Sequence, residues 1–215
     1  MTRRRTATTI TVATLAVVAV LGLTACDPGT PKPTGSGSSS PTATSSPTAS
    51  APQRPMPPRA DAPKSAEEAV AAANKAYRAY LDAQIPFFED VSLGPQYLSG
   101  YVLQGGPAWK GLSDTSDHGV NTIKSGGPFG WTLNDAMTYA SAATDMSNGQ
   151  KDPNGAVHLF GCLDDTKIQY GVPEIKNTAG APTEVVMIFV ADAHSWMIQD
   201  DHRMSASSGE AMPQC

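Results

Sequence analysis

The sequence predicts an α+β domain in which helices on the N-terminal side pack on one face of an antiparallel sheet. Two observations lead to this prediction. A helix-start signal near residue 65 opens a run of apolar residues at helical spacing, and the C-terminal half of the chain contains short apolar runs of the kind that form strands. Helices that precede a series of strands are typical of this class, whereas alternating strands and helices would indicate a parallel α/β fold.

The 215 residues divide into three unlike segments. We expect residues 1–25 to be a signal peptide, residues 26–63 to be a lipidated cysteine followed by a disordered linker, and residues 64–215 to be one globular domain. Ten of the 18 prolines lie between residues 27 and 63, a stretch without aromatic residues, Leu, Ile or Val. Such a segment cannot build a core, reaches roughly 30–40 Å as a coil, and has a composition that also suits O-glycosylation.

The first segment has the parts of an export signal. Arg3, Arg4 and Arg5 precede the uncharged apolar stretch 10–23, which is shorter than the roughly 20 residues that span a membrane. Leu23-Thr24-Ala25-Cys26 resembles the bacterial lipobox, which implies that Cys26 becomes the mature N-terminus and carries acyl chains such as palmitate. That resemblance implies an extracytoplasmic protein anchored to the outer face of the cell membrane. Secretion with release and a short uncleaved anchor are the alternatives.

The charge of the chain limits its partners. Its formal net charge is −5, and removal of the three arginines of the first segment would make it −8. Binding to nucleic acid requires clustered Lys and Arg against the phosphates, and residues 26–215 contain no such cluster. We therefore expect no nucleic-acid partner, and a membrane contact that depends on the lipid anchor.

The predicted domain opens with a helix from Ser65 to about Gln84. Ser65 and Glu68 have the spacing of a capping box, and Pro86 is expected to end the helix. One face of this helix should be apolar, with residues at spacings of three and four: Val70, Ala73, Tyr77, Tyr80 and Leu81.

The region after the first helix is less regular. Residues 87–102 read as two short helical pieces around the Gly94-Pro95 break. Residues 104–130 contain seven glycines and no sustained period, which indicates a loop or a poorly specified helix.

The remaining elements read as strands. We interpret residues 131–146 as strand, although helix is the alternative, and residues 152–155 as a turn. Further strands are expected at 156–163 and 167–170. The runs 183–191 and 196–200 should form an antiparallel hairpin across the turn at Asp192-Ala193-His194-Ser195, with Trp196 and Ile198 on one face.

Two cysteines remain once Cys26 carries lipid. Beyond the membrane the compartment is oxidising, so the even pair Cys162 and Cys215 favours a disulfide, which would hold the polar tail after Arg203. Two free thiols are the alternative.

The order of these elements resembles a known family. The capped helix with its two tyrosines, the segments Cys162-Leu163-Asp164 and Trp196-Met197-Ile198, and the terminal Cys215 are similar to NTF2-like (SnoaL/ketosteroid-isomerase-like) domains of actinobacterial-type lipoproteins. The resemblance implies a cone in which a curved sheet wraps a long helix and leaves a pocket at its open end. The pocket candidates under this resemblance are Tyr77, Tyr80, Trp131, His158 and Asp164.

Catalytic signatures are missing from the sequence. It contains no G-x-S-x-G, H-E-x-x-H, C-x-x-C or phosphate-binding loop. Asp117-His118 and Asp201-His202 could each act as an acid/base unit, but solvated surface positions explain them as well. We therefore assign no catalytic residue, metal ligand or cofactor.

Three function classes stay open. The favoured one is a domain that binds a small apolar ligand, an envelope polymer or another envelope protein without catalysis. The first alternative is a dehydratase or isomerase that uses a pocket carboxylate or histidine, with Asp164 or His158 as the group to test. The second is a metal-capturing lipoprotein that uses His and Asp side chains.

Overall fold

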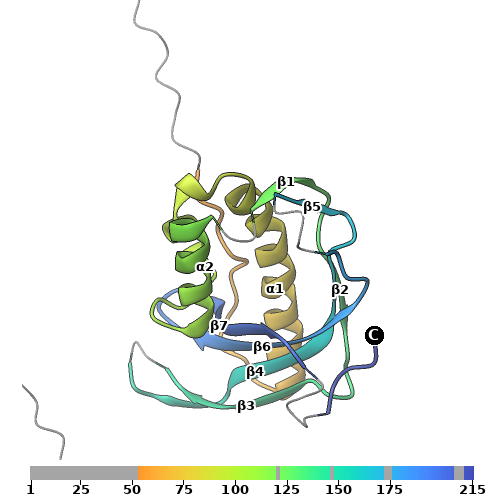
Figure 1. Cartoon of the computed structure of the whole chain (residues 1–215). Coiled ribbons are helices and arrows are strands. Elements are labelled where there is room, and N and C mark those ends of the chain that lie inside the picture. The colour runs from red at the N-terminus through yellow and green to blue at the C-terminus, as the bar shows by residue number, and fades with distance from the viewer. Residues whose placement is uncertain (1–52, 120–121, 146–147, 172–175, 206–210) are drawn as a thin grey trace, which may run out of the picture. The chain divides into compact units, whose positions relative to one another are not determined.

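A computed structural model describes residues 53–119, 122–145, 148–171, 176–205 and 211–215. These residues form the predicted α+β domain, in which helices α1 and α2 lie on one face of an antiparallel sheet (Figure 1). The predicted signal peptide, Cys26 and the first part of the linker lie outside the described residues. Within the described part of the chain, no helix combines the length and apolarity needed to cross a membrane.

Helix α1 spans Ala66–Glu89 and begins where the capping signal predicts. The Ser65 Oγ accepts a hydrogen bond of 3.2 Å from the backbone N–H of Glu68. The prediction that Pro86 ends the helix is wrong, because Pro86 lies inside α1. A proline removes one helical hydrogen bond, whereas the fully buried Phe87 fixes the last turn of α1 to the core.

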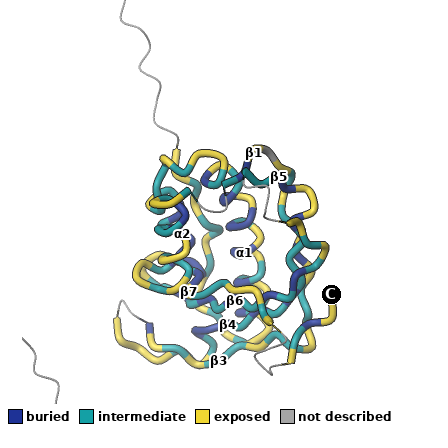
Figure 2. Tube along the Cα trace, viewed as in Figure 1, coloured by how far each residue is buried: buried dark blue, intermediate teal, exposed yellow. Residues whose placement is uncertain are grey.

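One face of α1 is buried against the sheet, as its periodicity predicts (Figure 2). Val70 on the same face is only partly buried. The buried positions lie mainly at helical spacings of three and four: Ala69, Ala73, Ala76, Tyr77, Tyr80, Leu81, Ala83, Gln84 and Phe87.

Two short 3-10 helices follow, η1 at Val91–Leu93 and η2 at Pro95–Leu98. They confirm the predicted pair of short helical pieces. Gly94 between them has a φ of 69°, a left-handed value that glycine adopts without strain. The chain then runs beside the sheet, where the Leu103 N–H donates to the carbonyl of Ile198 at 2.9 Å.

Helix α2 spans Pro107–His118 and corrects the expectation of a loop or a poorly specified helix. Its ends are well defined, because Pro107 suits a first helical position and Gly119 ends the helix at a φ of 66°. Leu112 and Thr115 are buried on its inner side. Tertiary packing thus stabilises a helix whose own sequence has little periodicity.

The main sheet has five strands in the order β2-β4-β6-β7, with β3 also paired to β4. All its pairs are antiparallel. The strands are β2 Gly130–Leu133, β3 Tyr139–Thr144, β4 Lys151–Asp164, β6 Ala181–Val190 and β7 Ser195–Arg203. A second, two-stranded sheet pairs β1 Ile123–Gly126 with β5 Ile168–Tyr170.

Two strand predictions need correction. The stretch 131–146 contains the two strands β2 and β3 instead of one. The predicted turn at 152–155 lies inside β4, and the chain reverses earlier, near Gly149, which has a φ of 71°. Pro153 is tolerated because β6 pairs with β4 only from Ala156 onward, so no β6 partner requires its missing N–H.

The β6–β7 hairpin confirms the strongest strand prediction. Trp196 and Ile198 are both fully buried on the face that α1 covers. Along β6, buried and half-buried residues alternate without exception (Figure 2). The hairpin therefore supplies one wall of the core, opposite the buried face of α1.

The described part of the predicted linker, residues 53–63, makes specific contacts with the domain. The Tyr101 Oη donates a hydrogen bond of 2.9 Å to the carbonyl of Met56, and the Ala60 N–H donates one of 2.8 Å to the carbonyl of His194. Prolines lower the entropy that an extended segment loses when it is fixed. Residues 53–63 therefore lie against the domain without forming a helix or a strand, which corrects the expectation that the linker is disordered up to residue 63.

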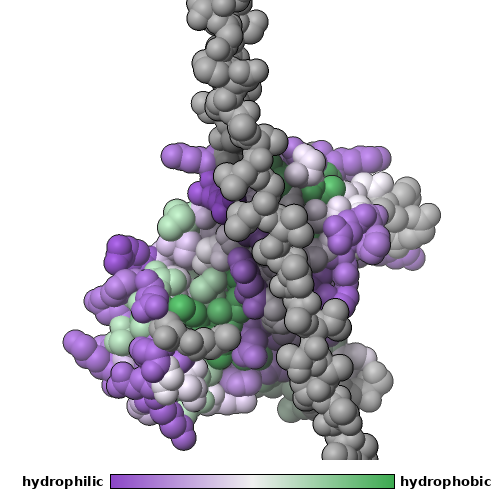
Figure 3. All heavy atoms as spheres, turned by 90° about the vertical axis from the view of Figure 1, so that its left-hand side faces the viewer, coloured by the Kyte–Doolittle hydropathy of each residue, from purple (hydrophilic) through white to green (hydrophobic). Residues whose placement is uncertain are grey.

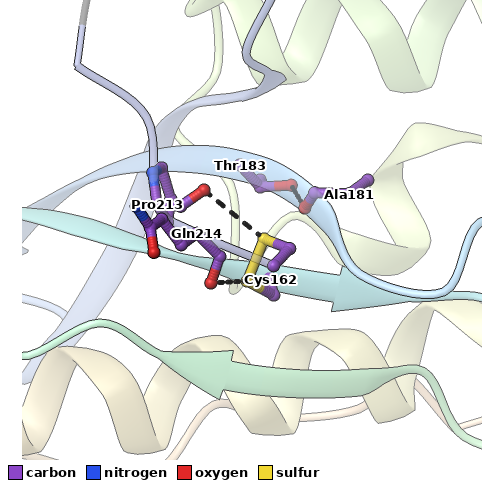
Figure 4. Close-up of a disulfide and its surroundings, with 6 residues drawn as sticks. Cys162, Ala181, Thr183, Pro213 and Gln214 are labelled. Atoms are coloured by element: carbon purple, nitrogen blue, oxygen red, sulfur yellow. Dashed lines mark hydrogen bonds between the residues drawn. A yellow bond between two sulfur atoms is a disulfide. The ribbon is translucent and has the colours of Figure 1, made fainter.

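The disulfide between Cys162 and Cys215 is confirmed, with a Cα–Cα distance of 5.6 Å (Figure 4). It joins the end of the chain to β4. The buried Pro213 and the backbone at Gly180 lie beside it, and a Cβ added to Gly180 would approach the Cys215 Cβ to 3.1 Å. The end of the tail is therefore held by a covalent bond and by close packing.

The outer surface does not single out one site. Among the described residues, the large apolar side chains classed as exposed are Met56 and Tyr139. On the face shown in Figure 3, hydrophobic residues gather in one area and hydrophilic residues border it. Scattered or limited apolar areas are ordinary on single domains, so these surface residues do not by themselves indicate a binding site.

Candidate functional site

A cavity of about 470 Å³ lies between α1, α2 and the inner face of the sheet. Its size falls within the range of small-molecule sites. Most of its wall is apolar and comes from both helices, β4 and the segment before β2: Leu81, Phe88, Ala108, Leu112, Phe129 and Leu163. Its polar lining consists of six side chains: Tyr80, Gln84, Thr115, Tyr170, Asp201 and Arg203.

Asp201 reaches the cavity because of an irregularity in β7. Val186 pairs with Asp200, but the next β6 residue, Met187, pairs with Ile198, so Gln199 is an extra residue on β7. Such a bulge reverses the alternation of faces. Ile198 and Asp201 therefore both face the interior, although an uninterrupted strand would place residues three apart on opposite faces.

The negative charge of the Asp201 carboxylate is only weakly compensated by neighbouring groups of the domain. Its Oδ2 accepts a hydrogen bond from the Tyr77 Oη at 3.3 Å. Burial raises the pKa of Asp201 to about 6, helped by the neighbouring Asp200 and opposed by the Tyr77 hydrogen bond and by His202 and Arg203. At neutral pH the group is mostly ionised, but it is close enough to its pKa to exchange a proton readily.

A second polar cluster at the cavity is centred on Asp165, which is fully buried. Its Oδ2 accepts hydrogen bonds from the Arg203 guanidinium at 2.7 Å and from the Tyr170 Oη at 2.6 Å. Its Oδ1 accepts one from the Thr178 N–H. Burial acts to raise the pKa of Asp165, but these hydrogen bonds outweigh it and hold the pKa below its usual value.

Three of the five predicted pocket residues lie together on the inner side. Tyr80 lines the cavity. Tyr77 is buried behind it, with its ring centroid 6.1 Å from that of Tyr80 and 4.8 Å from that of Trp131 in an edge-to-face contact. The Trp131 Nε1 donates a hydrogen bond of 2.9 Å to the Asn74 Oδ1. These aromatic residues support the cavity wall and position the Tyr77 hydroxyl against Asp201.

His158 does not line the cavity. It alternates with the buried residues of β4 and lies on the outer face of the sheet. Its Nδ1 lies 2.9 Å from the Glu184 Oε1, and its ring stacks on Tyr139 at a centroid distance of 4.6 Å.

Asp164 also lies away from the cavity, at the end of β4. Its Oδ1 accepts hydrogen bonds from the hydroxyl and the backbone N–H of Thr166, which lower its pKa. This carboxylate therefore organises a turn.

The sequence suggests Asp201 only as part of an Asp201-His202 unit, but in the structure Asp201 lines the cavity and His202 does not. His202 points outward, where its Nδ1 lies 3.5 Å from the Asp200 Oδ2 and its Nε2 lies 3.7 Å from the Glu184 Oε2. The other pair ends at His118, the exposed last residue of α2. Arg203 was not considered as a site residue at all. No local motif marks Asp201 or Arg203, because their inward direction depends on the bulge in β7.

The described residues contain no group of three or more His, Cys, Asp or Glu side chains arranged to hold a metal ion. The cavity is partly open to solvent and has mainly apolar walls, with one weakly compensated carboxylate and one guanidinium already paired to another carboxylate. Chemically, it can bind a small molecule, accept a hydrogen bond from it, or accept a proton from it. Comparisons of the chain with protein-family models, curated proteins and solved structures find no match, so the geometry of this cavity carries the functional argument.

Proposed function

We propose that this chain is a lipid-anchored protein of the cell envelope whose domain binds a small, partly apolar ligand in the cavity beside Asp201. The observation that carries the proposal is the cavity itself, which combines mainly apolar walls with six polar side chains. The helix-on-sheet arrangement that encloses it supports an NTF2-like architecture. The Leu-Thr-Ala-Cys sequence at residues 23–26 supports the anchor and a location on the outer face of the membrane.

Ligand binding can be tested with N-phenyl-1-naphthylamine, a neutral apolar dye whose fluorescence rises in a dry pocket. We expect saturable one-to-one binding to the full-length chain. Gly111→Phe should weaken it at least tenfold, because a Cβ at Gly111 meets no atom within 4 Å and the larger side chain can enter the cavity. Lys110→Phe, at an exposed position of α2, is the matched control. Non-saturable uptake, or equal affinity in both variants, would refute the proposal.

The anchor has its own test. Cys26→Ser removes the only thiol at the predicted lipidation position, so the chain should leave the membrane fraction and lose the mass of the acyl chains. Mass spectrometry of the native chain and membrane fractionation of both chains measure this. Retention of the variant on the membrane would contradict lipid anchoring while leaving the cavity proposal intact.

Proton transfer is the second candidate function, and the raised pKa of Asp201 favours it. A carboxylate whose pKa is raised by burial is a stronger base than one with the ordinary pKa. 5-Nitrobenzisoxazole is a suitable probe, since removal of its carbon-bound proton breaks the N–O bond and releases a coloured phenolate. An enzyme of this kind should open it faster above pH 6, and Asp201→Asn should abolish the effect. Equal rates in both chains would leave binding without catalysis.

A further inference from the structure

The charges around the cavity do not cancel when Asp201 is ionised. Arg203 is the cationic side chain of the lining, and its guanidinium is paired with the buried Asp165 at 2.7 Å. The Tyr170 hydroxyl donates to the same carboxylate. Asp165 and Arg203 therefore neutralise each other, and Asp201 leaves a net charge of about −1 at the polar side of the cavity.

The protein supplies Asp201 with few donors of its own. Among the described residues, its one hydrogen bond comes from the Tyr77 Oη, and at 3.3 Å it is long for an O–H donor. His202, the next residue, points to the other face of the sheet and lies near Glu184. Asp201 is half-buried and lines the cavity. A carboxylate at such a position with one long hydrogen bond is costly for a fold to keep, unless a ligand completes its surroundings.

Much of the remaining cavity lining is aromatic or apolar. Tyr80, Phe88 and Phe129 line the same space as Asp201. The faces of such rings attract cations, most strongly where water is excluded. Leu112 and Leu163 add apolar surface for the uncharged part of a ligand.

We propose that the ligand of this cavity is a monocationic amphipathic molecule, with an ammonium group at Asp201 and an apolar body against Phe88, Leu112 and Phe129. This inference rests on the proposed ligand-binding function and specifies its chemistry. An ammonium group restores neutrality and donates the hydrogen bonds that Asp201 lacks. An anion would face the Asp201 charge, and the guanidinium in the lining is already paired with Asp165. A neutral alcohol would donate one hydrogen bond and leave the charge in place.

The test uses three probes with one scaffold: 3-phenylpropylamine, 3-phenylpropan-1-ol and 3-phenylpropanoate. Calorimetric titration of the full-length chain at pH 7.5 should rank the amine at least tenfold tighter than the alcohol, with the propanoate weakest. In Asp201→Asn the amine should lose this advantage while the alcohol still binds. Asp200→Asn, one residue away on the outer face, should keep the native ranking.

The results distinguish a failure of the cationic-ligand proposal from a failure of the proposed ligand binding. Equal or tighter binding of the alcohol or the propanoate by the native chain would overturn the cationic ligand, and so would an amine preference that survives Asp201→Asn. Failure of the amine to bind a chain that does bind the naphthylamine dye would also overturn it. In each of these cases the cavity remains a binding site. Failure of all four molecules to bind would refute both proposals.

Discussion

The indole of Trp131 lies directly against the backbone of Gly161 on the neighbouring strand. A Cβ built at Gly161 would come to 2.6 Å from the Trp131 Cη2 and to 2.5 Å from the carbonyl oxygen of Thr132. β2 and β4 are paired in this region, so neither backbone can easily move away. The absence of a side chain at Gly161 thus permits the contact between Trp131 and Tyr77 that supports the cavity wall.

Gly161→Ala should therefore destabilise the domain by about 1–3 kcal/mol, the usual cost of overpacking. Urea unfolding of the full-length chain, followed by tryptophan fluorescence, measures the change. Gly111→Ala is the matched control, because an added Cβ there meets no atom within 4 Å and alanine favours a helix by up to about 1 kcal/mol. The interpretation fails if both alanine variants change the free energy of unfolding in the same direction.

Asp201→Asn should stabilise the domain at neutral pH. The pKa of Asp201 rises from 3.8 to about 6 on folding, so the folded state favours the protonated form. The stability that this preference contributes is present below pH 3.8 and is lost as the pH rises through 6. Asparagine stays neutral, and the gain at pH 7.5 should approach about 3 kcal/mol, decreasing to about 0.5 kcal/mol at pH 4.

Thermal unfolding of both chains between pH 4 and pH 8 measures that difference. The groups that act on Asp201 are the Tyr77 hydroxyl, Asp200, His202 and Arg203. Asp200→Asn is the control and should change the free energy of unfolding by less than about 0.5 kcal/mol, as is usual for surface positions. A stabilisation by Asp201→Asn that does not depend on pH would mean that ionisation is not its cause.

The Cys162–Cys215 bond should be a major source of stability. It closes a loop with a sequence separation of 53, which corresponds to about 4 kcal/mol in the chain-entropy model. The double variant Cys162→Ser/Cys215→Ser should lose an amount of this order in urea unfolding. As a check on the native chain, alkylation without reductant should add nothing at these two positions. Alkylation of both residues before reduction would show that the bond is not formed in the isolated protein.

Variants at the two outlying pocket candidates should leave ligand binding unchanged. His158→Ala and Asp164→Asn alter residues that face away from the cavity, so the affinity for the naphthylamine dye should stay within about twofold of the native value. Tyr80→Ala removes part of the wall and should weaken the same affinity about fivefold or more. Dye titration of the three variants measures this. A large loss in His158→Ala would indicate a binding site on the outer face of the sheet.

The features that sequence analysis predicts well are those with a local cause. The Ser65–Glu68 spacing locates the start of α1, because a cap acts within one turn. The β6–β7 hairpin follows from two apolar runs and a short turn between them. The disulfide follows from the two cysteines that the expected lipidation of Cys26 leaves over, in the oxidising compartment that the same expectation implies.

The features that it misses depend on distant contacts. Helix α2 forms because the rest of the domain buries its residues Leu112 and Thr115. Helix α1 continues past Pro86 because Phe87 is buried. The site is missed for the same reason. Gln199 is an extra residue only when β7 is paired with β6, and the resulting bulge directs Asp201 toward the cavity. Alternation within β7 alone would have directed Asp200 inward instead.

The covalent attachment of the C-terminus to β4 has a practical consequence for labelling. Cys215 is exposed, yet its sulfur is bonded to a strand in the middle of the main sheet. A spin label or fluorophore fused directly after Cys215 would therefore rotate with the sheet and not with a loose tail. The anisotropy of the fluorophore would then report the tumbling of the whole domain, and reduction of the bond would lower that anisotropy.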